Sequence, residues 1–144
     1  IYNTVIRQLA EAGLADGYGG SRIDLMVLNV TYPLVPDEIV AFARGKRAVL
    51  VLEEGSPEFI EHFILQALAQ SDAGTKVVGK SLIPATGEMT GEVVAQGIAA
   101  FLETYGAPDA AAAFGPVTAR IAAAKVEGAA ADSAALPPRG PTAR

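Results

Sequence analysis

The stretch Ala48-Val49-Leu50-Val51-Leu52 decides how the chain folds, and Glu53-Glu54-Gly55-Ser56-Pro57 follows it directly. Consecutive apolar residues without alternation are typical of a strand that is buried on both faces, as in a parallel sheet covered by helices. Ser56 is a favourable N-cap, and Pro57 lacks an N–H at a position where none is needed. The stretch therefore predicts a strand at residues 48–52 and a helix directly after it.

Similar stretches lie on either side of this strand, at intervals that leave room for helices. The run Leu-Met-Val-Leu-Asn-Val at residues 25–30 predicts a strand, and Lys76-Val77-Val78-Gly79 predicts a shorter one. Helices are expected where apolar residues recur at helical spacing; they begin at Asn3 or Thr4, at Pro36, after Ser56 and at Thr90. The alternation of helices and buried strands predicts an α/β fold with a mostly parallel sheet.

The front of this arrangement is incomplete. Three short strands are few for such a sheet, and the first predicted helix has no strand before it. The chain also begins with Ile1 rather than Met. We therefore expect that the chain is a piece of a longer protein, that the sheet lacks its first strands, and that one of its edges is open.

Composition excludes several classes of function. The chain has 144 residues, a length that fits one domain, and it contains no cysteine, one histidine and a formal charge of −5. Disulfides, cysteine-held clusters, thiol nucleophiles and multi-histidine metal sites are thus excluded for this chain. The acidic balance argues against nucleic-acid binding, and no apolar run approaches the roughly 20 residues of a membrane span. We see no signal peptide and expect a cytoplasmic protein.

The apolar content is unevenly distributed along the chain. Residues 107–144 contain 15 of the 28 alanines and five of the nine prolines, but only one aromatic residue, Phe114. This composition predicts a folded domain at residues 1–106 and a poorly packing Ala/Pro-rich linker at residues 107–144. Within the linker, Val117, Ile121 and Ala124 can form one face of a short helix between Val117 and Val126.

Two glycine-containing loops were considered as anion sites. Gly17-x-Gly19-Gly20 follows a helix and precedes a strand, whereas a dinucleotide-binding loop follows a strand and opens a helix. The helix start at Gly55-Ser56 has the required topology, but Glu53 and Glu54 stand before it and would repel a phosphate. A cap and a turn are therefore the favoured interpretation of Gly55-Ser56.

The Glu53-Glu54 pair is the most suggestive polar feature, because open α/β sheets place functional residues at the carboxyl ends of their strands. Paired acids can bind a metal, act as general acid and base, or contact a partner. Adjacent strand residues point to opposite faces, which favours an interface or structural role over a shared ion. If Asn29 is buried, it needs a hydrogen-bond partner, and neighbouring backbone is favoured over a ligand. Gly87-Glu88-Met89-Thr90 is interpreted as a loop that leads into a helix cap, and His62 has no nucleophile to activate. No catalytic constellation emerges.

Beyond these local features, a longer motif resembles a known family. The residues on which the resemblance rests are Leu28-Asn29-Val30-Thr31-Tyr32-Pro33-Leu34-Val35-Pro36, then residues 45–61 with Glu53-Glu54-Gly55-x-Pro57, then Gly79-Lys80-x-Leu82-x-Pro84 and Gly87-Glu88-x-Thr90. Over about residues 1–105 the chain resembles the alpha subunit of indolepyruvate ferredoxin oxidoreductases, which are 2-oxoacid:ferredoxin oxidoreductases. The matching region is their central transketolase C-terminal-like domain.

The resemblance implies a three-layer α/β/α fold with a five-stranded mixed sheet, of which this chain keeps the last three strands. It implies that Leu136-Pro137-Pro138-Arg139 belongs to the linker toward a downstream thiamine-diphosphate-binding domain. In that family the parent enzyme oxidatively decarboxylates arylpyruvates such as indolepyruvate, yielding an aryl-acetyl-CoA, carbon dioxide and reduced ferredoxin. Its thiamine diphosphate, Mg²⁺ and 4Fe–4S iron–sulfur clusters are held by other domains, and its partners are a beta subunit and ferredoxin.

For this chain the resemblance implies a non-catalytic organising domain, with no catalytic, cofactor-binding or metal-binding residue of its own. Contacts with the flanking thiamine-diphosphate-binding domains are expected at strand ends and loops; the candidates are Tyr32, Pro33, Leu34, Glu53, Glu54, Gly55 and Glu88. A homodimer is a further candidate assembly. Nucleic acid and membranes are not expected as partners. A free-standing nucleotide- or flavin-binding module and a pure dimerisation module remain the alternatives.

Overall fold

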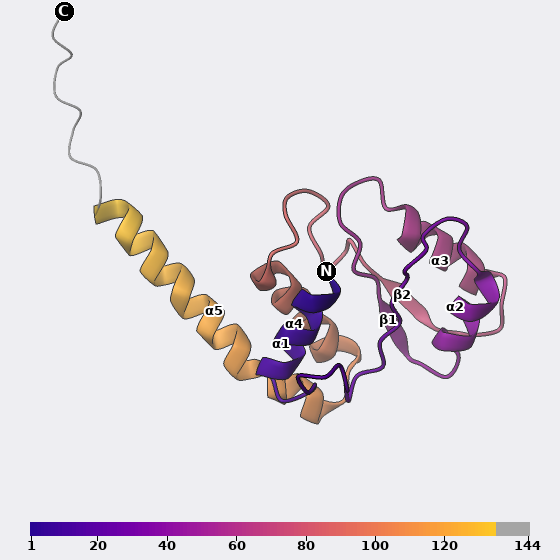
Figure 1. The fold of residues 1–144 in the computed structure, drawn as a ribbon, viewed down its shortest axis with the longest axis horizontal. Helices are drawn as coiled ribbons and strands as arrows, with labels where there is room; N and C mark the ends of the chain where they lie inside the picture. The colour runs from indigo at the N-terminus through magenta and orange to yellow at the C-terminus, as the bar shows by residue number, and fades with distance from the viewer. Residues whose placement is uncertain (135–144) are drawn as a thin grey trace, which may run out of the picture.

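The computed structural model describes the backbone of residues 1–134 and the side chains of residues 1–127 (Figure 1). Within these residues the chain is a mixed α/β protein with five helices and a short parallel sheet. The elements, in chain order, are α1 (Tyr2–Glu11), α2 (Pro36–Ala43), β1 (Ala48–Leu50), α3 (Phe59–Ala69), β2 (Lys76–Val78), α4 (Gly91–Tyr105) and α5 (Pro108–Ala134). The expected linker motif at residues 136–139 lies outside the described residues.

The sheet consists of β1 and β2, which run parallel with Ala48 opposite Lys76 and Leu50 opposite Val78. The ladder extends by one bond beyond each end of β1: the Val51 N–H donates to the Val78 carbonyl over 2.8 Å, and the Lys76 N–H to the Arg47 carbonyl over 3.2 Å. The predictions of strands at residues 48–52 and 76–79 are thus confirmed, although both strands are shorter than expected.

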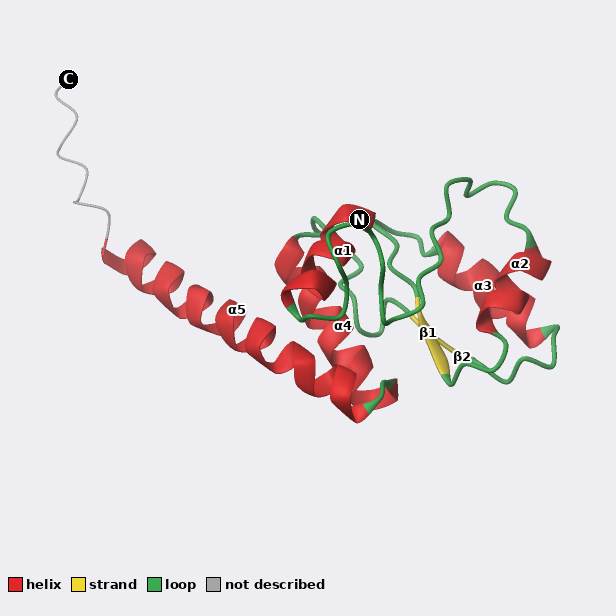
Figure 2. Ribbon diagram, turned by 60° about the horizontal axis from the view of Figure 1, so that its bottom comes forward, coloured by secondary structure: helices red, strands yellow, loops and turns green. Residues whose placement is uncertain are grey.

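Helices cover both faces of this sheet, as Figures 1 and 2 show. Side chains alternate along a strand, so neighbouring residues of β1 face opposite helices. Leu50 and Leu52 pack against the cluster formed by α1, α4 and α5. Val49 and Val51 pack against the cluster of α2 and α3. This burial on both faces explains why the strand sequence is apolar without alternation.

The prediction of a strand at residues 25–30 is wrong. The segment is extended, but no backbone–backbone hydrogen bond between described residues involves residues 24–34. A strand needs a partner backbone, and no described part of the chain supplies one on either side of this segment. Asn29, expected to need a hydrogen-bond partner if buried, is exposed.

The helix boundaries follow capping chemistry, with two corrections. Helix α1 begins at Tyr2 with Ile1 at its N-cap position, so neither Asn3 nor Thr4 caps it. Thr90 caps α4 as expected, with its Oγ1 accepting from the Val93 N–H over 3.3 Å. Ser56 does not cap α3, which begins at Phe59 rather than directly after Ser56. The physical reason is a competing acceptor, the Glu53 carboxylate, which reaches the first N–H groups of α3.

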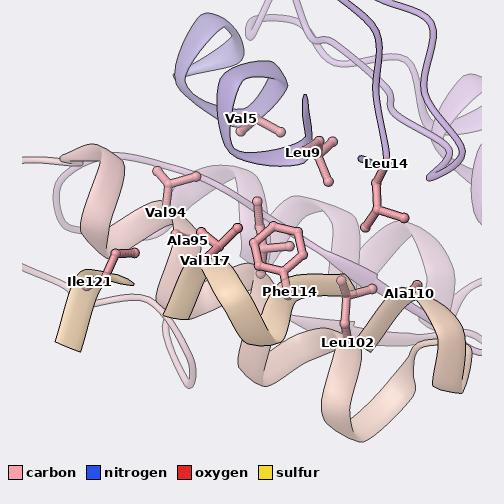
Figure 3. Packing of buried hydrophobic residues seen from close by; sticks show 11 residues of the cluster. Val5, Leu9, Leu14, Val94, Ala95, Leu102, Ala110, Phe114, Val117 and Ile121 are labelled. Carbon is pink, nitrogen blue, oxygen red and sulfur yellow. The ribbon is translucent and has the colours of Figure 1, made fainter. Parts of the chain in front are cut away.

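Helix α5 corrects the expectation that the chain packs poorly after residue 106. Its side chains Ala110, Phe114, Val117 and Ile121 are buried in one cluster with residues of α1 and α4 (Figure 3). They recur at spacings of four, three and four residues, which places them on one face of a helix. The predicted helix between Val117 and Val126 is confirmed as part of α5. The division into a domain at residues 1–106 and a linker stays a prediction.

Candidate functional site

The carboxyl ends of β1 and β2 lie at the same edge of the sheet, because the strands are parallel. Glu53 and Glu54 follow β1, and Gly79 and Lys80 follow β2. The structure brings these two segments together with the start of α3 and with the loop that precedes α4. We call Glu53, Glu54, Glu61, Lys80 and Met89 the strand-end cluster.

Glu53 is held against the N-terminus of α3. Its Oε1 and Oε2 accept from the Ile60 N–H over 3.0 and 3.1 Å, and Oε2 also accepts from the Glu61 N–H over 3.3 Å. The first N–H groups of a helix have no partner within the helix, and the helix dipole favours a negative charge there. The Glu53 carboxylate therefore caps α3 and occupies the anion site that Gly55-Ser56 would otherwise offer.

Lys80 connects the two strand ends through both its backbone and its side chain. Its N–H donates to Glu61 Oε2 over 2.8 Å, and its Nζ donates to the backbone carbonyl of Glu53. Gly79 is buried, and a Cβ at this position would collide with the Glu61 carboxylate. A side chain at this position would therefore displace the Glu61 carboxylate from the Lys80 N–H.

Glu54 connects the end of β1 to the loop before α4. Its Oε1 accepts from the Met89 N–H over 3.2 Å. Gly55 follows with φ of 86°, a left-handed conformation that glycine adopts without strain. Glu88, beside Met89, is exposed. The two glutamates thus act on different elements, which agrees with the expectation that they do not share one ion.

The Tyr32-Pro33-Leu34 loop approaches the same edge. Its residues line an apolar groove of about 1420 Å³, and Glu53 and Glu54 line the same groove. Tyr32 is 91% exposed. Of the seven candidate residues, the structure brings these five together along the groove, while Gly55 and Glu88 do not line it.

Sequence reasoning did not single out Glu61, Lys80 and Met89 as members of this cluster. The available signal was the position of Gly79-Lys80 directly after a short buried strand, since the ends of neighbouring parallel strands meet at one edge. Glu61 participates through both its N–H and its carboxylate, and Met89 through its N–H, and no local pattern identifies such contacts.

The remaining sequence motifs have structural roles. In the Gly17-x-Gly19-Gly20 loop, Asp16 Oδ1 accepts from the N–H groups of Tyr18 and Gly20, each over 2.8 Å, and so closes a turn. His62 is exposed on α3. Among the described residues no group of three or more His, Cys, Asp and Glu is arranged to hold a metal ion. No described helix is long and apolar enough to cross a membrane.

The strand-end cluster can hold backbone segments together, and Tyr32 presents an exposed aromatic ring at the groove that Glu53 and Glu54 also line. No family model matches the chain, and neither the curated proteins nor the solved structures include a match to it.

Proposed function

We propose that this chain is an organising domain, without catalytic residues of its own, of an indolepyruvate (arylpyruvate):ferredoxin oxidoreductase. The observation that carries the proposal is the use of the two strand-end glutamates: both carboxylates accept hydrogen bonds from backbone N–H groups of the same chain. They fasten α3 and the loop before α4 to the end of β1. A parallel sheet with helices on both faces supports the finer proposal of a three-layer α/β/α domain of the transketolase C-terminal-like type.

In this proposal the chemistry of the parent enzyme takes place in other domains. Thiamine diphosphate, Mg²⁺ and the 4Fe–4S clusters belong to those domains, and a beta subunit and ferredoxin complete the assembly. The contribution of this chain is contact with the thiamine-diphosphate-binding domains. Tyr32 is the leading contact residue, because an aromatic side chain that is 91% exposed at a loop tip is a typical interface anchor. Exposed Glu88 provides a polar contact near the same edge.

The test is a binding measurement between this chain and the thiamine-diphosphate-binding domains of an indolepyruvate ferredoxin oxidoreductase alpha subunit, by analytical ultracentrifugation. Tyr32→Ala should weaken the complex by about tenfold or more, as expected for the loss of a buried aromatic anchor. Tyr18→Ala is the matched control, because Tyr18 is 100% exposed in a different loop. Absence of a complex, or equal effects of the two variants, would contradict the proposal.

The nucleotide-binding alternative is tested separately by calorimetric titration of the chain with FMN, NAD, CoA and thiamine diphosphate. We expect no binding, because the Glu53 carboxylate occupies the helix N-terminus at which a phosphate would bind. Micromolar binding of any of these compounds would favour a free-standing nucleotide- or flavin-binding module instead.

A further inference from the structure

One edge of β1 has no partner among the described residues. Successive residues of a strand point their backbone N–H and C=O groups to opposite edges. Arg47 and Val51 bond to β2, so Ala48, Leu50 and Leu52 direct their backbone groups to the other edge. No backbone–backbone hydrogen bond between described residues occupies those groups.

The extended segment at residues 24–34 lies across the groove from this open edge. It runs in the same direction as β1: Asp24 forms an ion pair of 2.9 Å with Lys46, just before β1, and Tyr32 lines the groove together with Glu53, just after β1. The backbone groups of the segment are unpaired within the described part of the chain. Two parallel stretches of unpaired backbone thus flank one groove.

The groove between them is apolar toward both helix layers. On one side its lining includes Leu9 of α1 and Ile98 of α4, and on the other Ile39 of α2 and Phe63 of α3. Apolar side chains of the segment that line the groove remain accessible, with Leu25 37% and Val27 48% exposed. An occupant must therefore be apolar on both faces and must also pair with backbone groups along both edges. A small apolar ligand can meet the first requirement but not the second.

The charges along the groove further define the occupant. At the amino end of β1 the charged side chains pair with each other: Lys46 with Asp24, and Arg22 with Asp109 over 2.8 Å. At the carboxyl end, Glu53 and Glu54 form no ion pair with any cation among the described residues. The complementary occupant is uncharged along the groove and basic where it passes these glutamates.

We propose that this groove receives an apolar β-strand of about five residues that hydrogen-bonds to β1 on one side and to residues 24–34 on the other. The strand comes from a partner polypeptide that is apolar over these residues and basic after them; residues 135–144 do not supply it, because they contain three prolines and no apolar run of strand length. A second copy of this chain is disfavoured, because residues 25–28 and 48–52 of its own apolar runs already form the walls of its groove. This inference rests on the groove alone and does not depend on the proposed function.

The probe for this proposal is the peptide acetyl-Gly-Val-Val-Ile-Val-Val-Lys-Lys-amide, with binding followed by fluorescence anisotropy of a labelled form. The matched control peptide has the same side chains and N-methyl groups on alternate residues of the apolar run, so it stays apolar but cannot complete a ladder. We expect the control to bind at least about tenfold more weakly, because two or more hydrogen bonds are lost. Equal affinity of the two peptides would overturn the proposal.

Variants of the protein locate the binding site. Val27→Glu places a charge in the groove and should weaken the peptide complex by at least about tenfold, because a carboxylate would then be desolvated without a partner. Leu25→Glu serves as a second groove variant if the first does not fold, because Leu25 also lines the groove and is 37% exposed. Val126→Glu is the matched control, since Val126 is an exposed valine on α5 outside the groove. Equal effects of groove and control variants would contradict the inference.

Two further measurements distinguish a strand from other occupants. Hydrogen exchange should slow at the amides of Ala48, Leu50 and Leu52 when the peptide binds, because these are the free donors of β1. Sedimentation of the chain alone should show a monomer, because the groove is not expected to bind a second copy of the chain. Unchanged exchange at these amides would contradict the proposal and indicate nonspecific adsorption of the peptide. A dimer that does not bind the peptide would also contradict it and indicate that the groove is an interface between two copies of the chain.

Discussion

Replacing Phe114 with alanine tests whether α5 is part of the folded core. The ring is 1% exposed and lies among side chains of α1, α4 and α5 (Figure 3). Removing a buried phenylalanine ring costs about 3–5 kcal/mol of unfolding free energy, through lost transfer energy and the cavity that remains. Domains of this size are stable by only about 5–15 kcal/mol, so the variant should lose a large fraction of its stability.

Urea unfolding followed by circular dichroism measures this loss. With a slope of about 1–3 kcal/mol per molar urea, Phe114→Ala should lower the midpoint by about 1–5 M. Phe59→Ala is the matched control, because Phe59 is 70% exposed and its replacement should cost less than about 0.5 kcal/mol. Phe114→Leu keeps most of the volume and should cost about 1 kcal/mol, which stays measurable if the alanine variant is unfolded. Equal midpoints for Phe114→Ala and Phe59→Ala would refute the packing of α5.

Two other substitutions test the strand-end cluster. Glu53→Gln keeps the shape of the side chain but removes the charge that caps α3; it should lower the unfolding free energy by about 1 kcal/mol in urea titrations, and an effect no larger than that of Glu54→Gln would count against the cap. Gly79→Ala should lower the melting temperature, because its Cβ meets the Glu61 carboxylate. Gly115→Ala, in open space on α5, should instead raise stability by about 0.5–1 kcal/mol; a Gly79→Ala variant that gains stability likewise would show that the close approach is absent.

Strand prediction from the sequence succeeded where the strand and its partner were both present in the chain. β1 and β2 have apolar runs without alternation, and each bonds to the other. Residues 25–30 have the same pattern, yet they form no ladder. An apolar run without alternation indicates that a segment is suited to burial on both faces. A strand also needs a neighbouring backbone to hydrogen-bond with, and the sequence of the segment itself does not show whether one is present.

The candidate site shows a similar division between local and tertiary information. Its position at the strand ends was predictable, because parallel strands place functional residues at their carboxyl ends. The cap of α3 was assigned to Ser56, the nearest suitable side chain, whereas Glu53 reaches the helix start from seven residues before Ile60. Such a contact depends on how β1 delivers the chain to the helix, and sequence spacing alone does not reveal it.

The burial of side chains from α5 is not evident from composition, for a different reason. Average composition suggested a linker, since alanine and proline dominate. The burial of α5 depends on four side chains at helical spacing, Ala110, Phe114, Val117 and Ile121, and the surrounding alanines dilute this signal. A periodicity count over the segment identifies the buried face where a composition count does not.

The length of α5 sets a rotational constraint on whatever follows it. From Ile121, the last buried residue among the side chains described up to residue 127, the helix continues to Ala134, a rise of about 20 Å at 1.5 Å per residue. Each residue of a helix advances the chain by about 100° around the axis. Inserting one alanine after Lys125 would therefore leave the core unchanged but turn the backbone of Ala134 through more than a quarter of a revolution about the helix axis, so the exact length of α5 sets the direction in which the helix ends.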